Sequence, residues 1–296
     1  MKKLLLLATA VLCSVAAACG NPSSSSTSNS SSPGSNPCAT KNLKTRTAGT
    51  LTIGTDNPAY DPYFLGPAGD GWTGQYNHDP YNDQGFEDVV AYAVAKQLGF
   101  PKNKVKWSVT HFNQSFAPGP KNFDFYLAQV SYKPVRTKFA DLSGSYYNVN
   151  QALVALKGKP IDSATSIADL KPYKLGAQVG TTGYDVITKT IQPSQSPQVY
   201  SNTNDALTAL KNGQIDGLVV DYPTAYYMAV VQLSNGDLVG QFPAPPGGEH
   251  FSLVLDKGSS LTPCVNKALN VLRSNGTLAS IQQRWLSNLE HAPVLK

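Results

Sequence analysis

The sequence predicts an α/β fold with two domains, each built on one open and mostly parallel sheet. Three observations lead to this prediction. The chain has 296 residues, and a typical domain of roughly 150 residues implies two domains. Hydrophobic residues make up 41% of the chain and charged residues only 15%, so the folded part can bury a sizeable core. Short apolar runs typical of strands alternate with helical periodicities through both halves.

The first half of the predicted fold begins after the turn at Gly49. Apolar residues recur at helical spacing over 86–98, and Gly99 then fits the end of this helix. Four extended runs accompany the helix, over 51–54, 105–109, 123–130 and 151–156. Residues 56–84 are rich in Pro, Gly, Tyr, Asn and Asp, so they predict a long loop, and long loops in compact domains often carry function.

The second half repeats the alternation. Extended runs are predicted over 175–179, 199–200, 218–220 and 252–255. Helices are predicted from Gly183 to 191, over 203–211, from about Pro223, over 261–274 and over 277–289. Asn202 or Thr203 can cap the second of these helices, and Gly213 ends it. Because ligands of open α/β sheets bind beyond the carboxyl ends of strands, residues that follow strands are the candidates for a site.

The N-terminus has the pattern of an export signal. Lys2 and Lys3 precede a largely apolar stretch over 4–18, which is shorter than the roughly 20 residues of a membrane span. Small residues then precede Cys19, and this arrangement resembles the lipobox of bacterial lipoproteins, which implies cleavage before Cys19 and lipid on that cysteine. An ordinary cleavage site with Cys19 incidental is the alternative. We therefore expect residues 1–18 to be a lipoprotein signal peptide.

A Ser-rich segment follows Cys19. Residues 21–37 are mostly Ser with Pro, Asn, Gly and Thr, which have little to bury and are typical of a disordered chain. A flexible coil of this length reaches roughly 20–25 Å. We expect residues 19–47 to be a lipidated cysteine and a tether that hold the folded part at the outer face of the bacterial cell membrane.

The cysteines fit an exported protein. Cys13 lies in the expected signal peptide and Cys19 in the expected anchor, which leaves Cys38 and Cys264 as an even pair. A disulfide between them is expected in an oxidising compartment, and two separate free thiols are the alternative. We expect no metal site and no cofactor. The four histidines are dispersed without ligand spacing, at His78, His111, His250 and His291.

Charge and hydropathy exclude two broad classes of protein. The formal net charge is +5, and the expected loss of residues 1–18 with their two lysines reduces it to +3. This charge is too small and too scattered for a nucleic-acid-binding protein. No internal run reaches the roughly 18 apolar residues of a membrane-spanning helix, so a polytopic membrane protein is excluded as well.

Three segments that follow predicted strands carry candidate binding groups. Arg136 offers a planar fork that suits a carboxylate, although an isolated arginine is more often a surface residue. The run 180–183 offers helix-start N–H groups and the hydroxyls of Thr181 and Thr182, although it can be a simple cap. Asp221 can pair with an ammonium group or cap the next helix. Together these groups complement an α-amino acid.

Short fragments from about Gly49 to the end of the chain match one known family in their order and spacing. In the first part they lie at 51–56, 60–64, 85–88, 131–136, 139–143 and 146–147. In the second part they lie at 180–183, 209–216, 219–221, 266–269, 276–278 and Trp285. Through these fragments the chain resembles the family 3 extracellular solute-binding proteins of ABC importers, in the polar amino-acid group.

The resemblance implies a two-lobed periplasmic-binding-protein-like fold of type II, in which two crossover strands join two open sheets. Residues 48–155 together with 251–296 would form the first lobe, and residues 156–250 the second. Such lobes close over one ligand by a hinge motion. The predicted sheets and the predicted post-strand groups are compatible with this arrangement.

The resemblance also implies which residues bind a ligand. Arg136 and the backbone of Ser131 would hold the ligand carboxylate, helped by the amide and hydroxyl of Thr182. Asp221 would hold the amine, with Gln129 nearby.

Further positions concern the ligand side chain. Tyr60 and Phe112 would sandwich it, unless they are plain core aromatics, and Asp56 could meet its distal end. The chain departs from the family at Lys133, which replaces a threonine that contacts the carboxylate. Lys133 either adds a cation to the pocket or points to solvent while its amide binds. The loop over 65–84 is longer than usual and could form part of the cleft rim, with Trp72, Tyr76 and Tyr81.

These expectations combine into a lipid-anchored, extracytoplasmic receptor that captures a polar amino acid or similar small solute. It would act as a monomer and deliver the ligand to the permease subunits of an ABC transporter. No catalytic residues are expected, because the sequence shows no nucleophile–base pair and no known hydrolase motif. An enzyme on the same fold, such as a cyclohexadienyl-dehydratase-like protein, and a ligand-sensing receptor are the alternatives.

Overall fold

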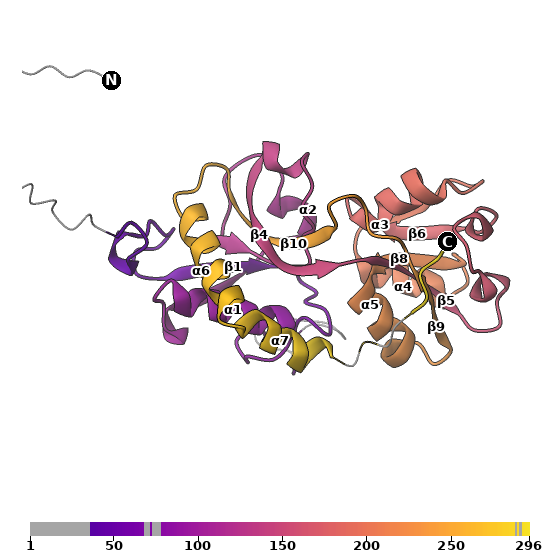
Figure 1. The fold of residues 1–296 in the computed structure, drawn as a ribbon, viewed down its shortest axis with the longest axis horizontal. Coiled ribbons are helices and arrows are strands. Elements are labelled where there is room, and N and C mark those ends of the chain that lie inside the picture. Colours follow the sequence, from indigo (N-terminus) through magenta and orange to yellow (C-terminus); the bar gives the residue numbers. More distant parts are fainter. Residues whose placement is uncertain (1–35, 68–71, 73–77, 288, 290–291) are drawn as a thin grey trace, which may run out of the picture. The chain divides into compact units, whose positions relative to one another are not determined.

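Two five-stranded sheets organise the computed structural model of the chain, which describes residues 36–67, 72, 78–287, 289 and 292–296 (Figure 1). The expected signal peptide, Cys19 and most of the expected tether lie outside the described residues. In the described part, none of the helices combines the length and the apolar character that a membrane crossing needs.

The first sheet has the strand order β2–β1–β3–β10–β4, and β10 runs against the other four strands. Its strands are β1 (Leu51–Thr55), β2 (Val105–Val109), β3 (Phe125–Tyr126), β4 (Ala140–Val149) and β10 (Glu249–Asp256). β1 pairs in parallel with β2 and β3, whereas β10 runs antiparallel to β3 and β4. We call this sheet and the helices packed on it the first lobe.

The second sheet repeats this design in the order β7–β6–β8–β5–β9. Its strands are β5 (Gln151–Leu156), β6 (Leu175–Gln178), β7 (Gln198–Tyr200), β8 (Gly217–Asp221) and β9 (Gly236–Gln241). β6 pairs in parallel with β7 and β8, and β5 runs antiparallel to β8 and β9. We call this sheet and its helices the second lobe.

The two sheets are mixed, so the expectation of mostly parallel sheets is wrong. In each sheet one strand runs against the other four, because the chain re-enters the first lobe along β10 and enters the second lobe along β5. The patterns of β4 and β9 did not predict these strands. β4 alternates irregularly between buried and exposed residues, and β9 includes Gly236 and Gly240 in only six residues.

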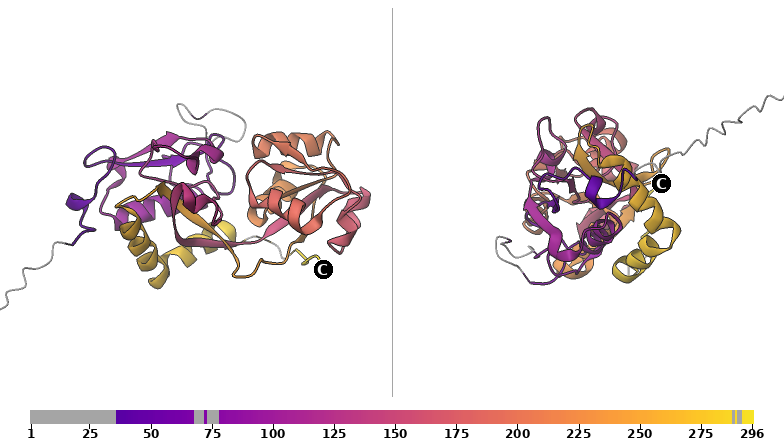
Figure 2. Two further views of the ribbon diagram at one scale, coloured as in Figure 1. Left: turned by 90° about the horizontal axis from the view of Figure 1, so that it is seen from above. Right: turned by 90° about the vertical axis from the view of Figure 1, so that its left-hand side faces the viewer.

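Helices cover both sheets (Figure 2). In the first lobe these are α1 (Phe86–Gln97), the short α2 (Phe112–Ser115), α6 (Thr262–Ser274) and α7 (Thr277–Leu286). In the second lobe they are α3 (Thr182–Asp185), which continues as a π-helix over Val186–Ile191, α4 (Thr203–Lys211), and α5 (Tyr222–Tyr227), which continues as a π-helix over Met228–Gln232. Short 3₁₀ turns lie at Thr40–Asn42, Lys102–Lys104, Arg136–Lys138, Pro160–Ser163 and Ala168–Leu170.

Two crossovers join the lobes. The first is short, because only Asn150 separates β4 from β5, and the second runs from the end of β9 to the start of β10. β5 pairs along its length with β8 and β9 of the second sheet. The chain therefore enters the second lobe at Gln151, whereas the predicted boundary lies after residue 155.

The C-terminal tail adds a third passage between the lobes, which the sequence did not predict. Gln241 at the end of β9 donates its N–H to Pro293 O at 2.8 Å, and Leu295 donates its N–H to Gln241 O at 2.9 Å. The side chain of Leu295 is 1% exposed and packs into the core of the second lobe. Gly240 allows this contact, because a Cβ there would lie 2.8 Å from Leu295 Cγ.

The apolar residues form separate cores in the two lobes. One cluster combines β1 and β10 with α1, α6 and α7 of the first lobe. Two further clusters lie in the second lobe. The expected disulfide is confirmed, because Cys38 and Cys264 are bonded, with Cα atoms 5.3 Å apart. It fastens the start of the described chain to α6.

Candidate functional site

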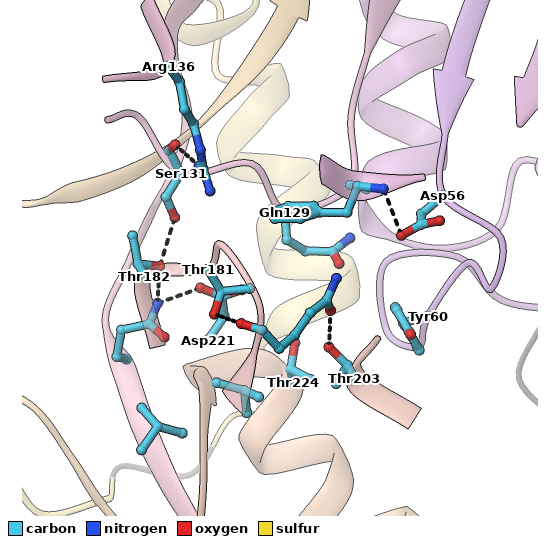
Figure 3. Close-up of a pocket in the computed structure, with 16 residues that line it drawn as sticks. Asp56, Tyr60, Gln129, Ser131, Arg136, Thr181, Thr182, Thr203, Asp221 and Thr224 are labelled. Carbon is cyan, nitrogen blue, oxygen red and sulfur yellow. Dashed lines mark hydrogen bonds between the residues drawn. The ribbon is translucent and has the colours of Figure 1, made fainter. Parts of the chain in front are cut away.

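A small cavity of about 40 Å³ lies where the carboxyl ends of the parallel strands of both lobes meet (Figure 3). Its wall combines polar, charged and aromatic side chains from both lobes. The residues that line it are Asp56, Tyr60, Phe112, Ala128, Gln129, Ser131, Arg136, Gln151, Gln178, Thr181, Thr182, Thr203, Val219, Val220, Asp221 and Thr224. In the described part of the chain, no group of three or more His, Cys, Asp or Glu side chains could hold a metal ion.

Arg136 is the cationic centre of this wall. Its guanidinium is buried and donates to Ser131 O and, across the cavity, to Gly180 O at 2.9 Å. The Arg136 Cζ lies 4.3 Å from the centroid of the Phe116 ring, as in a cation–π contact. Burial lowers the pKa of Arg136 to about 10, so the group is still charged at neutral pH. Because a guanidinium carries five N–H donors, a carboxylate can bind beside these contacts.

Hydroxyl groups flank the guanidinium. Thr182 at the start of α3 donates its hydroxyl to Ser131 Oγ at 3.5 Å, which links the two lobes. Thr181 caps the same helix, because its hydroxyl accepts from Tyr184 N at 3.2 Å. Thr181 also donates to Gln178 O at 2.8 Å. The predicted carboxylate-binding groups therefore come together around Arg136.

Asp221 lies at the end of β8, on the opposite side of the cavity from Asp56 in Figure 3. Its side chain does not cap α5, which excludes the simple cap as its role. Instead, Oδ1 accepts from Gln151 Nε2 at 2.6 Å. Burial, together with the negative charge of Glu249, raises the pKa of Asp221 well above its ordinary value.

Asp56, Tyr60 and Phe112 form the end of the cavity in the first lobe. Asp56 is buried and accepts from Phe112 N at 3.1 Å and from Asn57 N at 2.8 Å. Burial raises the pKa of Asp56, and these hydrogen bonds together with His111 oppose that effect. The two aromatic rings of Tyr60 and Phe112 line the cavity and are at the same time largely buried. The predicted aromatic walls are therefore part of the cavity and of the core.

Gln129 lies in the wall with a left-handed backbone, at φ 53°. Its N–H donates to Glu87 Oε1 at 2.7 Å, and its side-chain Nε2 donates to Glu87 Oε2. Glu87 at the start of α1 is fully buried, and burial raises its pKa to about 7. Gln129 also lines the cavity, and its place near the amine of a ligand stays a prediction.

Lys133 lies apart from the other predicted site residues. It is not among the residues that line the cavity, because its Nζ pairs with a carboxylate oxygen of Asp185 in α3. Asp185 also pairs with Lys189 at 3.1 Å. Although burial opposes it, the two lysines lower the pKa of Asp185. The sequence left two alternatives for Lys133, a cation in the pocket or a side chain that points to solvent. Neither of them included this bridge between the lobes.

Sequence reasoning missed several groups of the site. Gln151, 3% exposed at the start of β5, donates to Asp221, Thr182 and Glu249. A polar residue that opens an otherwise apolar strand was the signal for it. Glu249 had no such signal, because it follows a Gly-rich turn in a polar stretch.

The expected cleft-rim loop over 65–84 is described only in part. Trp72 is 5% exposed and belongs to the core of the first lobe. Tyr81 is 43% exposed and accepts from Trp107 N at 2.9 Å. Tyr76 lies outside the described residues.

Comparison with known proteins identifies the relatives of this chain. A protein of Campylobacter jejuni named "Probable histidine-binding protein" is 28% identical over 221 residues, covering 71% of this chain and 81% of the relative. The "ABC transporter glutamine-binding protein GlnH" of Bacillus subtilis is 28% identical over 205 residues, covering 69% and 72%.

Solved structures share the fold. "An ancestral arginine-binding protein bound to arginine" superimposes with a TM-score of 0.65 at 28% identity, covering 80% of this chain and 98% of that one. This likeness confirms the predicted two-lobed architecture. The sequence model of the bacterial extracellular solute-binding proteins, family 3, matches residues 73–288. The chain therefore belongs to the bacterial extracellular solute-binding proteins of family 3.

Proposed function

We propose that this chain is the amino-acid receptor of an ABC importer, anchored by lipid to the outer face of a bacterial cell membrane. It captures an amino acid between its lobes and delivers it to the permease subunits, and it acts as a monomer without making or breaking bonds. The observation that carries this proposal is one cavity with the buried Arg136 on one side and the half-buried Asp221 on another. Arg136 pairs with the ligand carboxylate and Asp221 with its ammonium group.

The charge of the cavity favours a basic amino acid as the ligand. Arg136 faces two carboxylates of the wall, Asp56 and Asp221. If Arg136 holds the α-carboxylate and Asp221 the α-ammonium group, the carboxylate of Asp56 is left for the side chain of the ligand. Because a buried unpaired charge is costly, a cationic side chain matches Asp56 better than a neutral one.

Ligand entry requires the lobes to move apart. The cavity of about 40 Å³ has room for a few water molecules, which is less than an amino acid occupies. Contacts that cross it, such as Arg136 to Gly180 and Thr182 to Ser131, hold the lobes together in this structure. A hinge motion at the crossovers opens such a site, and a ligand that touches both lobes favours the closed form.

A thermal-shift screen of the purified mature protein against the twenty amino acids tests the proposed function. We expect L-arginine, L-lysine or L-histidine to raise the melting temperature most, because a ligand stabilises the folded form by mass action. Agmatine, which is arginine without its carboxylate, is the matched control and should give little shift. A screen in which no amino acid raises the melting temperature contradicts the proposal.

Mass spectrometry of the protein isolated from membranes tests the anchor. We expect a chain that begins at Cys19 and carries lipid on that residue. A Cys19→Ala variant should appear in the soluble fraction with its ligand affinity unchanged. A mature chain that starts elsewhere and carries no lipid overturns this part of the proposal and leaves the binding function intact.

A further inference from the structure

Glu249 connects the second crossover to both ends of the proposed ligand site. It is the first residue of β10, where the chain returns from the second lobe. Glu249 does not line the cavity, so it does not itself contact a bound ligand there. Its carboxylate nevertheless bonds to two residues that do line it.

The contacts of Glu249 form a short chain of hydrogen bonds. Its Oε1 accepts from Ser131 Oγ at 2.5 Å and from Gln151 Nε2 at 3.0 Å. The same Nε2 atom donates to Asp221 Oδ1 at 2.6 Å. One amide nitrogen therefore bridges two carboxylates, that of Asp221 in the proposed amine subsite and that of Glu249 behind it.

The carboxylates of Asp221 and Glu249 share one hydrogen-bond donor, so their negative charges repel each other across it. The repulsion between them is partly offset by Arg136, whose charge acts on both. Other charged and titratable groups interact with the pair, namely Glu87 of α1, the neighbouring His250, Tyr63, Tyr146 and Tyr147. Burial lowers the pKa of His250, and Glu87 adds a further negative charge, so Arg136 is the cation that the structure places against the pair.

We propose that Glu249 is a positioning residue that makes the proposed amine subsite bind a proton when the ligand is absent, so that an arriving ammonium group displaces it. This inference rests on the proposed function. In the free protein Asp221 holds this proton beside the carboxylate of Glu249. When the ligand ammonium group pairs with Asp221, that proton leaves to solvent, and the positive charge of the ligand replaces it.

The sign of the pH dependence follows from this exchange. The pKa of Asp221 is raised by burial and by Glu249, so Asp221 becomes protonated as the pH falls through a range well above that of an ordinary aspartate. Protonated Asp221 is a poor partner for an ammonium group. The affinity therefore weakens as the pH falls, by up to about tenfold per pH unit when one proton is exchanged.

Isothermal titration calorimetry with L-arginine tests the exchange. Titrations at pH 5.5 to 8.5, in buffers with different heats of ionisation, give both the dissociation constant and the number of protons released. For the wild-type protein we expect release of up to one proton per ligand and a dissociation constant that rises as the pH falls. The α-ammonium and guanidinium groups of arginine remain charged over most of this range, so they add little to the measured release.

The Glu249→Gln variant separates charge from structure. Glutamine keeps an acceptor for Ser131 and Gln151 but removes the negative charge. We expect the number of protons released near neutral pH to drop to a small fraction of the wild-type number. The affinity of the variant should begin to weaken only at a lower pH than that of the wild-type protein. A His250→Gln variant is the matched control, since it removes a neighbouring titratable group, and it should behave like the wild-type protein.

The outcomes distinguish this inference from the proposed function. If L-arginine does not bind, the titration is repeated with the amino acid that shifts the melting temperature most. Binding without proton release, or an unchanged pH profile in Glu249→Gln, overturns the inference and leaves the receptor function standing. If no amino acid binds at any pH, the proposed function fails and the inference fails with it.

Discussion

The two lobes line one cavity with different chemistry. The first lobe supplies the arginine, both aromatic rings and Asp56, whereas the second lobe supplies mainly threonines and Asp221. The first-lobe groups are also fixed within their own lobe, since Arg136 donates to Ser131 O and Asp56 accepts from Phe112 N. Because these side chains are already held in place before a ligand binds, less conformational entropy is lost on binding.

The second lobe contributes contacts that reach across the cavity. Gly180 O accepts from Arg136, and the hydroxyl of Thr182 donates to Ser131. These bonds join one lobe to the other. If the proposed function is right, we expect the first lobe to bind the ligand first and the second lobe to complete the site on closure. Four variants test this comparison, from the largest expected effect to the smallest.

Arg136→Ala removes the central group of the first lobe. We expect the affinity for L-arginine to fall at least about 30-fold, because loss of one partner of a buried charge pair costs about 2–5 kcal/mol. Calorimetry measures the change. Arg284→Ala, which removes an exposed arginine of α7, is the matched control and should bind normally. Near-wild-type binding by Arg136→Ala contradicts the assignment of the carboxylate subsite.

The disulfide fastens only the first lobe. A double variant, Cys38→Ser with Cys264→Ser, opens a loop that separates the two cysteines by 226 residues. We expect the free energy of unfolding to decrease by about 2–5 kcal/mol, as for other native disulfides. The dissociation constant at low temperature should stay unchanged, because neither cysteine lines the cavity. Chemical denaturation and calorimetry on the same samples check both statements, and a large loss of affinity without loss of stability contradicts them.

Asp56→Asn tests whether the first lobe also binds the ligand side chain and selects for its charge. The affinity for L-arginine should fall about 10- to 100-fold, because a hydrogen bond between charged groups contributes about 1.5–3 kcal/mol. L-Citrulline, the neutral analogue of arginine, should bind the variant as well as it binds the wild-type protein. Equal losses for both ligands mean that Asp56 supports the fold of the site and does not select for charge.

Lys133→Ala breaks the salt bridge between the lobes outside the cavity. We expect a two- to fivefold weaker affinity, because a partly exposed ion pair contributes about 0.5–1 kcal/mol to the closed form. Lys189→Ala is the matched control, since Lys189 pairs with the same Asp185 within the second lobe. A double-mutant cycle with Asp185→Ala measures the coupling directly. Equal effects of the two lysines show that the bridge does not favour closure.

The sequence was informative where a local pattern decides the structure. Alternating strands and helices and the helix stop at Gly99 follow from short-range signals, and the cysteine pair follows from the even count of cysteines left in an exported protein. The structure confirms all three. The positions of Arg136, Thr182 and Asp221 after strands also led to the cavity that they line.

The remaining features depend on contacts between distant segments. Lys133 finds Asp185 because the lobes close against each other, whereas Glu249 finds Ser131 because the start of β10 pairs with residues 130–132 within the first lobe. The strands β4 and β9 are defined by their partners more than by their own patterns. No periodicity within a segment can specify such pairings, so residue patterns alone left them undetermined.

The C-terminal tail has a consequence for the order in which the protein forms. Residues 151–241 supply every strand of the second sheet, yet Leu295 fills part of the core beneath it. Because a protein is synthesised from its N-terminus, the last of these strands is complete more than fifty residues before Leu295 is added. The second lobe therefore reaches this packing only after Leu295 has been made, and a Leu295→Asp change disturbs the core of strands that were synthesised earlier.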